Sequence, residues 1–141
     1  MGAKRFSPRR DYPLASKRPD LVKTPSGISL QDITLENVAS GKIAAQEIRI
    51  RPEILKRQAQ VAEAHGRAQL AANFRRAAEL TSLPDQEILR IYNALRPRRS
   101  TKEELLAVSR ELEERYRAPV NAAFIREAVE IYERRDLLKK D

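Results

Sequence analysis

The clearest hydrophobic pattern in the chain lies in residues 84–95. Its apolar side chains recur at i, i+3, i+4 and i+7, namely at Ile88, Ile91, Tyr92 and Leu95. This spacing places them on one face of an amphipathic helix. Pro84 precedes the pattern and Pro97 follows it, so we expect the helix to begin at the first proline and to end before the second.

A second helix should begin directly after this one, at Ser100. Glu103 follows Ser100 by three residues, which is the spacing of a capping box, in which each side chain bonds the backbone N–H of the other residue. Between the two helices, residues 96–100 (RPRRS) place three guanidinium groups in one short turn. We refer to residues 96–100 as the corner.

The remainder of residues 34–141 also has helical spacing. It predicts helices over 52–65, 67–81, 100–118 and 119–138, and a short helix that follows Asp32 or Thr34 and stops at Gly41. For 67–81, the expected buried face is Leu70, Phe74, Ala77, Ala78 and Thr81. No segment predicts a strand. The sequence therefore indicates an all-α fold, with a compact arrangement of about five helices in a helical domain of residues 34–141.

The first 33 residues have a different character. Four of the eight prolines fall between Pro8 and Pro25, and each of them interrupts helix propagation. We therefore predict an extended, basic, proline-rich N-terminal arm, residues 1–33. Apolar residues such as Tyr12 and Leu14 favour an arm that lies on a surface, of its own chain or of a partner, whereas residues 1–10 also fit a disordered tail.

The chain has a net charge of +8, from 28 basic and 20 acidic residues. Half of this excess lies in the arm, whereas acidic and basic residues alternate in the helical domain, as on solvated helix faces. The basic excess keeps a small helical nucleic-acid-binding protein as an alternative function. Cysteine is absent and no run of about 18 apolar residues occurs, so we expect a soluble, cytoplasmic protein without a membrane segment.

Catalytic chemistry is difficult to assemble from these residues. His65 is the single histidine and the four glycines are scattered, so the sequence offers no imidazole relay, histidine metal site or glycine-rich phosphate loop. We interpret His65, which precedes Gly66, as a helix-capping or surface residue. We predict no catalytic, cofactor-binding or metal-binding residue in this chain.

Two arginine clusters remain as candidates for binding. Residues 73–80 combine Arg75 and Arg76 with alanines small enough to admit another helix closely, and the corner supplies the second cluster. Both fit a solvated surface, or a docking surface whose guanidinium groups bind carboxylates. A helix-turn-helix that contacts phosphates is a further alternative, which the interspersed acidic residues disfavour.

Several segments, in the same order along the chain, are similar to one known family. They are residues 11–15 (DYPLA), 33–38 (ITLENV), 73–80 (NFRRAAEL), 91–97 (IYNALRP), 99–107 (RSTKEELLA) and 121–124 (NAAF). On these segments the chain resembles the small (gamma) subunit of adenosylcobalamin-dependent glycerol and diol dehydratases, over nearly all of its length from Asp11. One departure is Arg98, where the family pattern leads us to expect an aromatic residue.

The resemblance implies a noncatalytic role in a hydro-lyase that converts a vicinal diol, glycerol or propanediol, to an aldehyde and water. In this family the large subunit, a TIM barrel, holds the diol, the metal ion and the radical chemistry. The large and medium subunits bind adenosylcobalamin together. The small subunit docks on the large subunit, and the assembly contains two copies of each of the three chains.

Within this expectation, we predict that the subunit interface includes Tyr12, Asn73, Arg75, Arg76, Tyr92, Asn93, Arg96 and Arg99. Family members that enter bacterial microcompartments can carry an extra amphipathic N-terminal helix. Only ten residues, basic and broken by proline, precede Asp11 here. We therefore expect an unencapsulated or glycerol-type enzyme.

Overall fold

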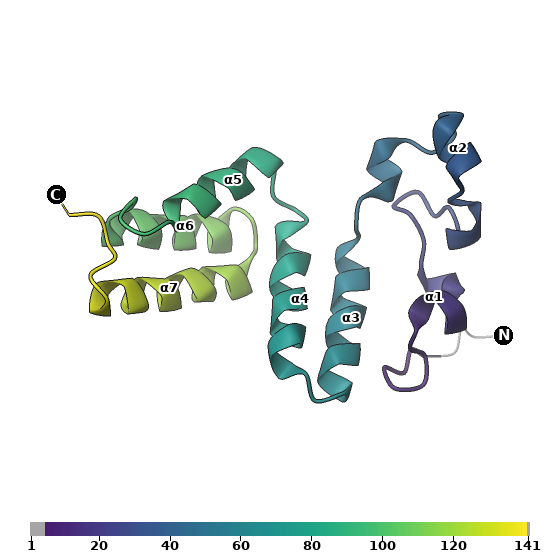
Figure 1. The fold of residues 1–141 in the computed structure, drawn as a ribbon, viewed down its shortest axis with the longest axis horizontal. Helices are drawn as coiled ribbons and strands as arrows, with labels where there is room; N and C mark the ends of the chain where they lie inside the picture. Colours follow the sequence, from purple (N-terminus) through teal and green to yellow (C-terminus); the bar gives the residue numbers. More distant parts are fainter. Residues whose placement is uncertain (1–4, 141) are drawn as a thin grey trace. The chain divides into compact units, whose positions relative to one another are not determined.

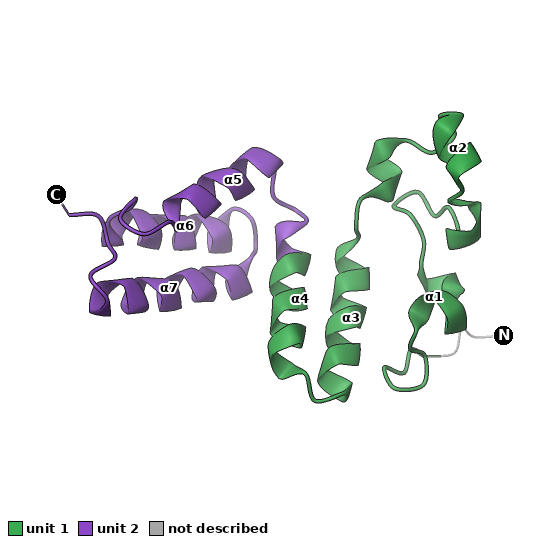
Figure 2. Ribbon diagram, in the orientation of Figure 1, with its two compact units in different colours: residues 1–78 green, residues 79–141 purple. Residues whose placement is uncertain are grey.

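The computed structural model describes residues 5–140 as a helical protein (Figure 1). Within these residues it contains seven α-helices and three short 3-10 helices, and the β-structure there is a single bridge between Lys23 and Ser29. The all-α prediction is confirmed, while residues 1–4 of the predicted arm lie outside the described residues. The chain divides into two compact units, unit 1 (residues 1–78) and unit 2 (residues 79–141), which we describe separately (Figure 2).

The beginning of unit 1 contains short helical turns within the predicted arm. They are helix α1 (Leu14–Lys17) and the 3-10 helices Pro19–Leu21 and Leu30–Asp32. Pro13 is the N-cap of α1, and Pro19 is the first residue of its 3-10 helix. Proline lacks an N–H group, but the first N–H groups of a helix have no partner within it, so proline is tolerated there. The prolines therefore begin helical turns in this segment.

Helix α2 (Leu35–Ala39) follows, and its cap is one of the two that we predicted. Thr34 is the N-cap, and its hydroxyl oxygen accepts a hydrogen bond from Asn37 N at 3.2 Å. The chain leaves the helix at Gly41, whose φ of +76° is in the left-handed region that glycine tolerates. A 3-10 helix at Ala45–Ile48 then leads towards the next helix.

Helices α3 (Pro52–Ala64) and α4 (Ala68–Leu80) form a hairpin that turns at Gly66, where φ is +73°. Its core is small: a buried cluster of three alanines, with Phe74 packed against it, holds the hairpin together (Ala59, Ala62 and Ala71). The predicted buried face of 67–81 is partly wrong, because Leu70 is 38% exposed and Thr81 is exposed. The side chains of α4 that are buried are Ala71 and Ala78.

Unit 2 contains α5 (Asp85–Ala94), α6 (Lys102–Glu114) and α7 (Pro119–Arg134) around a larger aliphatic core. The core residues are Leu83, Ile91, Leu105, Val108, Leu112, Ala118, Ala122, Ile125 and Val129. Of the four residues that the spacing placed on one face of α5, Ile91 is buried, whereas the side chain of Tyr92 is 66% exposed. Helix α7 also ends earlier than predicted: the chain turns at Asp136, with φ of +53°, and Leu138 then packs against the core.

The capping box at the start of α6 is one residue later than predicted. Thr101 is the N-cap: its side chain accepts from Glu104 N, and the Glu104 carboxylate accepts from Thr101 N at 2.9 Å. Ser100 is buried and donates its hydroxyl hydrogen to Ala94 O at 2.9 Å, at the end of α5. Because Ser100 completes the preceding helix, the next residue caps the following one.

Candidate docking surfaces

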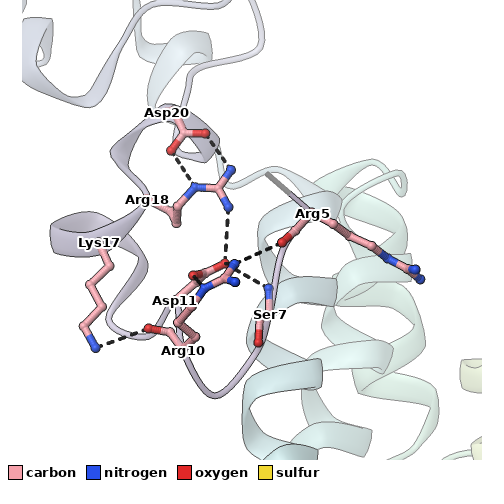
Figure 3. A network of polar contacts seen from close by, with 7 residues as sticks. All are labelled: Arg5, Ser7, Arg10, Asp11, Lys17, Arg18 and Asp20. Atoms are coloured by element: carbon pink, nitrogen blue, oxygen red, sulfur yellow. Dashed lines mark hydrogen bonds and ion pairs between the residues drawn. The ribbon is translucent and has the colours of Figure 1, made fainter. Parts of the chain in front are cut away.

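A buried carboxylate organises the first residues of unit 1 (Figure 3). Asp11 is 4% exposed and accepts hydrogen bonds from Ser7 N at 2.9 Å, Arg10 Nε at 2.6 Å and Arg18 Nη1 at 3.2 Å. Arg18 also donates to both carboxylate oxygens of Asp20, at 2.9 and 2.8 Å. We call this set of side chains the Asp11 hub.

The hub stabilises the charged form of Asp11. The hydrogen bond from Arg10 contributes most, followed by that from Ser7 N, and together with the positive charges of Arg10 and Arg18 they hold the pKa of Asp11 well below its usual range. Burial acts in the opposite direction, but more weakly. The carboxylate therefore remains an acceptor at any physiological pH, and the segment around it is fixed.

The hub places the next residue, Tyr12, on the surface of unit 1. Tyr12 is 53% exposed, and its ring lies 6.2 Å from that of His65 between centroids, tilted by 58°. The two rings border a hollow of about 310 Å³ whose walls also come from α1, α3 and α4 (Leu14, Val61, Leu70 and Phe74). We call it the aromatic hollow. The sequence did not indicate it, because Tyr12 and Phe74 are far apart along the chain.

His65 has a structural role in this arrangement. It is the C-cap of α3, it is exposed, and its ring Nδ1 lies 2.8 Å from Val61 O, so Nδ1 carries the hydrogen that is donated to this carbonyl. The interpretation as a capping and surface residue is confirmed. Its ring also forms one wall of the aromatic hollow.

The arginines of α4 have partners within unit 1. Arg75 Nη2 donates to Glu63 Oε2 at 2.5 Å, which links α4 to α3, and Arg76 donates to the side-chain oxygen of Asn73. Asn73 and Arg75 are exposed and Arg76 is half-buried. These three predicted interface residues therefore form hydrogen bonds within the α3–α4 hairpin.

In unit 2, the predicted interface residues of α5 and Arg96, which follows its C-cap, are exposed. Tyr92, Asn93 and Arg96 are all exposed, and Leu89, which the sequence analysis did not single out, is 61% exposed and precedes Tyr92 by one helical turn. The spacing i, i+3, i+4, i+7 from Leu89 could have revealed this face, which we call the α5 face. Large exposed apolar side chains beside polar ones are typical of a protein–protein interface.

Residues 96–99 of the corner are also exposed. Arg96 and Arg99 form no salt bridge within residues 5–140. Arg98, the position at which the family pattern is not followed, adopts φ of +62°, and its N–H donates to Leu137 O at 2.7 Å. The backbone of the corner is therefore held by the C-terminal segment, while its guanidinium groups remain accessible.

We also searched residues 5–140 for groups of side chains that could bind a metal ion. Among residues 5–140, no three His, Cys, Asp or Glu side chains come together in a group that could hold one. The only imidazole, His65, donates to a carbonyl of its own helix. No helix within this range is long and apolar enough to span a bilayer.

Comparison with known proteins decides between the remaining alternatives. The family model described as dehydratase small subunit matches residues 8–139. The chain belongs to this family. A propanediol dehydratase small subunit of Salmonella typhimurium (strain LT2) is 56% identical over 140 residues, which cover 99% of this chain and 81% of that protein. Another, of Citrobacter freundii, is 57% identical over 131 residues, which cover 93% of this chain and 76% of that protein.

The match confirms the resemblance and supports a subunit of a dehydratase over a nucleic-acid-binding protein. It extends over both units, from before the Asp11 hub to Lys139 beyond α7. Membership of a small-subunit family also agrees with the character of the surfaces described above, which offer exposed aromatic and cationic side chains for a protein partner. We therefore consider them as docking surfaces.

Proposed function

We propose that this chain is the noncatalytic small subunit of an adenosylcobalamin-dependent propanediol or glycerol dehydratase. The observation that carries the proposal is the match to the dehydratase small-subunit family over residues 8–139. Both relatives reported above are named for propanediol. Propanediol is therefore the diol that we propose, in place of the glycerol-type enzyme expected from the N-terminal segment. The complete enzyme would remove water from the diol to leave an aldehyde.

The partners in this proposal are a large and a medium subunit, with two copies of each of the three chains, in the cytoplasm. The cofactor would be bound by those two subunits, and the large subunit would carry out the radical chemistry. The role of the present chain is to dock on the large subunit and stabilise it.

Docking would use the aromatic hollow of unit 1 and the α5 face of unit 2. A permanent interface needs about 800 Å² from each partner, with aromatic and arginine side chains at its centre. Tyr12, at 53% exposure, and Tyr92, at 66%, supply such side chains. Asn93, Arg96 and Arg99 border the α5 face, whereas Asn73, Arg75 and Arg76 already have intramolecular partners and would contribute at the rim.

Coexpression with the large and medium subunits of the same organism tests the proposal. We expect the three chains to copurify and to convert propanediol when adenosylcobalamin is added, and the isolated small chain to give no turnover. Omission of the small chain should shorten the thermal half-life of the large subunit. Turnover by the isolated chain, or failure of the chains to copurify, would refute the proposed role.

A surface variant locates the contact within this experiment. The double substitution Leu89→Asp and Tyr92→Asp places two charges on the α5 face, where both side chains are exposed, so the fold should be retained. We expect it to prevent copurification. The matched control places two carboxylates at other exposed positions, by Ala107→Asp in α6 and Ala123→Asp in α7, and should copurify normally.

A further inference from the structure

The corner and the C-terminal segment form one surface of unit 2, although about 40 residues separate them in the sequence. Arg98 N donates to Leu137 O at 2.7 Å, and Lys139 N donates to Ser100 O at 2.9 Å. Figure 1 shows the last residues passing beside the turn between α5 and α6. Cations from two segments are thereby collected in one place, and we call this set the basic corner: Arg96, Arg98, Arg99 and Lys139.

A third hydrogen bond joins α7 to the end of α5, next to the corner. The Tyr132 hydroxyl, on α7, donates to Leu95 O at 2.5 Å, at the end of α5. Leu95 and Leu138 both pack against the core of unit 2. The backbone beneath the basic corner is therefore anchored from both sides, and its cations are held on a defined scaffold.

Two of the nearby acidic residues are already paired with other cations. Glu133 accepts from Lys102 at 2.8 Å, and Asp136 pairs with Lys140 at 2.9 Å. By contrast, Arg96, Arg99 and Lys139 have no salt bridge within residues 5–140. Elsewhere in unit 2, cations such as Arg126 are paired across helices. Lys140 and, to a smaller extent, Arg98 lower the pKa of Asp136, so the charge of Arg98 is partly compensated. Arg96, Arg99 and Lys139 are thus the exposed like charges of the basic corner that have no salt bridge within residues 5–140.

Arg98 adds a second indication. Its φ of +62° lies in the left-handed region, which is uncommon for a residue with a side chain and which glycine would adopt without strain. An arginine at this position contributes a positive charge, but its backbone conformation is less favourable than that of a glycine would be. Arg117 and Asp136 have similar φ values, of +51° and +53°, so the indication lies in the charge that Arg98 places beside Arg96 and Arg99 and not in the conformation itself.

We propose that the basic corner binds a cluster of carboxylates on the large subunit. This inference rests on the proposed function and names the chemistry of the contact. Guanidinium groups bind carboxylates in bidentate pairs, and opposite charges across an interface fix its orientation and accelerate association. Arg96 also belongs to the α5 face, so the apolar side chains of Leu89 and Tyr92 continue directly into the cationic group. An apolar contact with a charged border is the usual anatomy of a protein interface.

The surroundings favour carboxylates over nucleic-acid phosphates. Glu103 and Glu104 lie in the first turn of α6, directly after the corner, and Glu133 lies near the end of α7. A continuous phosphate backbone would pass close to these acids, whereas separate carboxylates can pair with individual arginines. The exposed Leu89 and Tyr92 on the adjoining face also have no role in a contact with phosphates.

The test measures binding of the full chain to the large subunit of the same organism. The variant carries Arg96→Glu and Arg99→Glu, and its matched control carries Arg110→Glu and Arg117→Glu. The control changes the net charge equally, its residues are exposed, and neither forms a salt bridge within residues 5–140. Arg117 lies beyond the far end of α6, a 13-residue helix of about 20 Å. Circular dichroism should give the same helix content for all three proteins.

We expect the corner variant to bind at least about tenfold more weakly than wild type, and the control to bind within about twofold of it. Wild-type affinity should fall as salt rises from about 0.1 M to about 1 M, where the screening length shrinks from about 10 Å to about 3 Å. Arg98→Gly should also weaken binding while unit 2 remains folded, because it removes a charge where glycine is unstrained.

Three outcomes are decisive. If wild type binds the large subunit and the corner variant binds equally well, the inference is refuted while the proposed function stands. If wild type does not bind at any salt concentration, both are refuted. If a duplex DNA of random sequence binds wild type but not the corner variant, and the large subunit binds both equally, the basic corner is a nucleic-acid site and the inference is again refuted.

Discussion

Removal of the Glu79 carboxylate should destabilise unit 2 through helix α7. This helix begins without a side-chain cap, because its N-cap is Ala118, and its first residue, Pro119, has no N–H. Glu79 supplies the side-chain acceptor for the first N–H groups of α7. Its carboxylate accepts from Val120 N at 3.0 Å and from Asn121 N at 2.9 Å, and Asn121 Nδ2 donates to it at 2.7 Å. A residue 41 positions away from Val120 thus caps the helix.

The size of the effect follows from these bonds. Loss of an N-cap costs about 1 kcal/mol, and a hydrogen bond to a charged group contributes about 1.5–3 kcal/mol. A negative charge at a helix N-terminus adds about 0.3–1 kcal/mol. The three terms overlap, so we expect Glu79→Ala to lower the free energy of unfolding by about 2–3 kcal/mol. Glu79→Gln, which keeps one acceptor oxygen but no charge, should lose about half of that.

Urea unfolding followed by circular dichroism at 222 nm measures the change, with fluorescence of the tyrosines as a second probe of cooperativity. The control is Glu127→Ala, which removes an exposed glutamate from the same helix and should change stability by less than about 0.5 kcal/mol. If Glu79→Ala also changed the free energy of unfolding by less than about 0.5 kcal/mol, the capping argument would be wrong.

Three further predictions concern other parts of the chain. Tyr116→Phe removes a buried hydroxyl that has no hydrogen-bond partner among residues 5–140, so it should leave the free energy of unfolding unchanged or raise it by about 1 kcal/mol in urea titration; clear destabilisation would reveal a partner for this hydroxyl. Leu105→Ala, at a fully buried position, should cost about 2–5 kcal/mol by the same titration, whereas Leu89→Ala, at 61% exposure, should cost less than about 1 kcal/mol. The folded-state pKa of Asp11 is depressed, so its stabilising effect is complete above the unfolded-state pKa of about 3.9 and is lost as pH falls towards the folded-state value. Protease cleavage of the first 20 residues should therefore increase below about pH 4 in wild type, and should already be high at neutral pH in Asp11→Asn; equal cleavage of the two proteins at neutral pH would contradict the role of the hub.

The helices of this chain could be predicted where local sequence determines them. Pro52 begins α3 and Gly66 ends its turn, as their backbone preferences require. Which residue is the N-cap of α6 could not be predicted in the same way. Ser100 with Glu103 and Thr101 with Glu104 both satisfy the capping-box pattern, and the choice depends on the bond from Ser100 to Ala94 O. That bond depends on how the preceding helix ends.

The composition of the candidate surfaces also could not be predicted from local sequence, because it depends on contacts between residues far apart in the chain. Tyr92 borders both the apolar stripe of α5 and the stripe that starts at Leu89, and the packing of α5 in unit 2 decides which stripe is buried. Lys139 lies beside the corner because its backbone N–H donates a hydrogen bond to Ser100 O, and no local sequence pattern predicts this bond. Glu79 likewise caps α7 from a distant segment. Local rules therefore identified the candidate arginines, while tertiary bonds determined which charges lie together.

The two units differ in how much of their stability they can supply themselves. The buried cluster between α3 and α4 consists of alanines with one phenylalanine beside it, and alanine removes little apolar area from water, whereas the core of unit 2 contains several leucines and isoleucines. Unit 1 also leaves large apolar side chains exposed, at 86% for Leu35, 55% for Ile48 and 56% for Ile50. Apolar area that remains in water contributes nothing to the folding of the isolated chain but does contribute when a partner covers it. Unit 1 should therefore gain more protection from amide hydrogen exchange on docking than unit 2 does, because its own core supplies less of the required free energy.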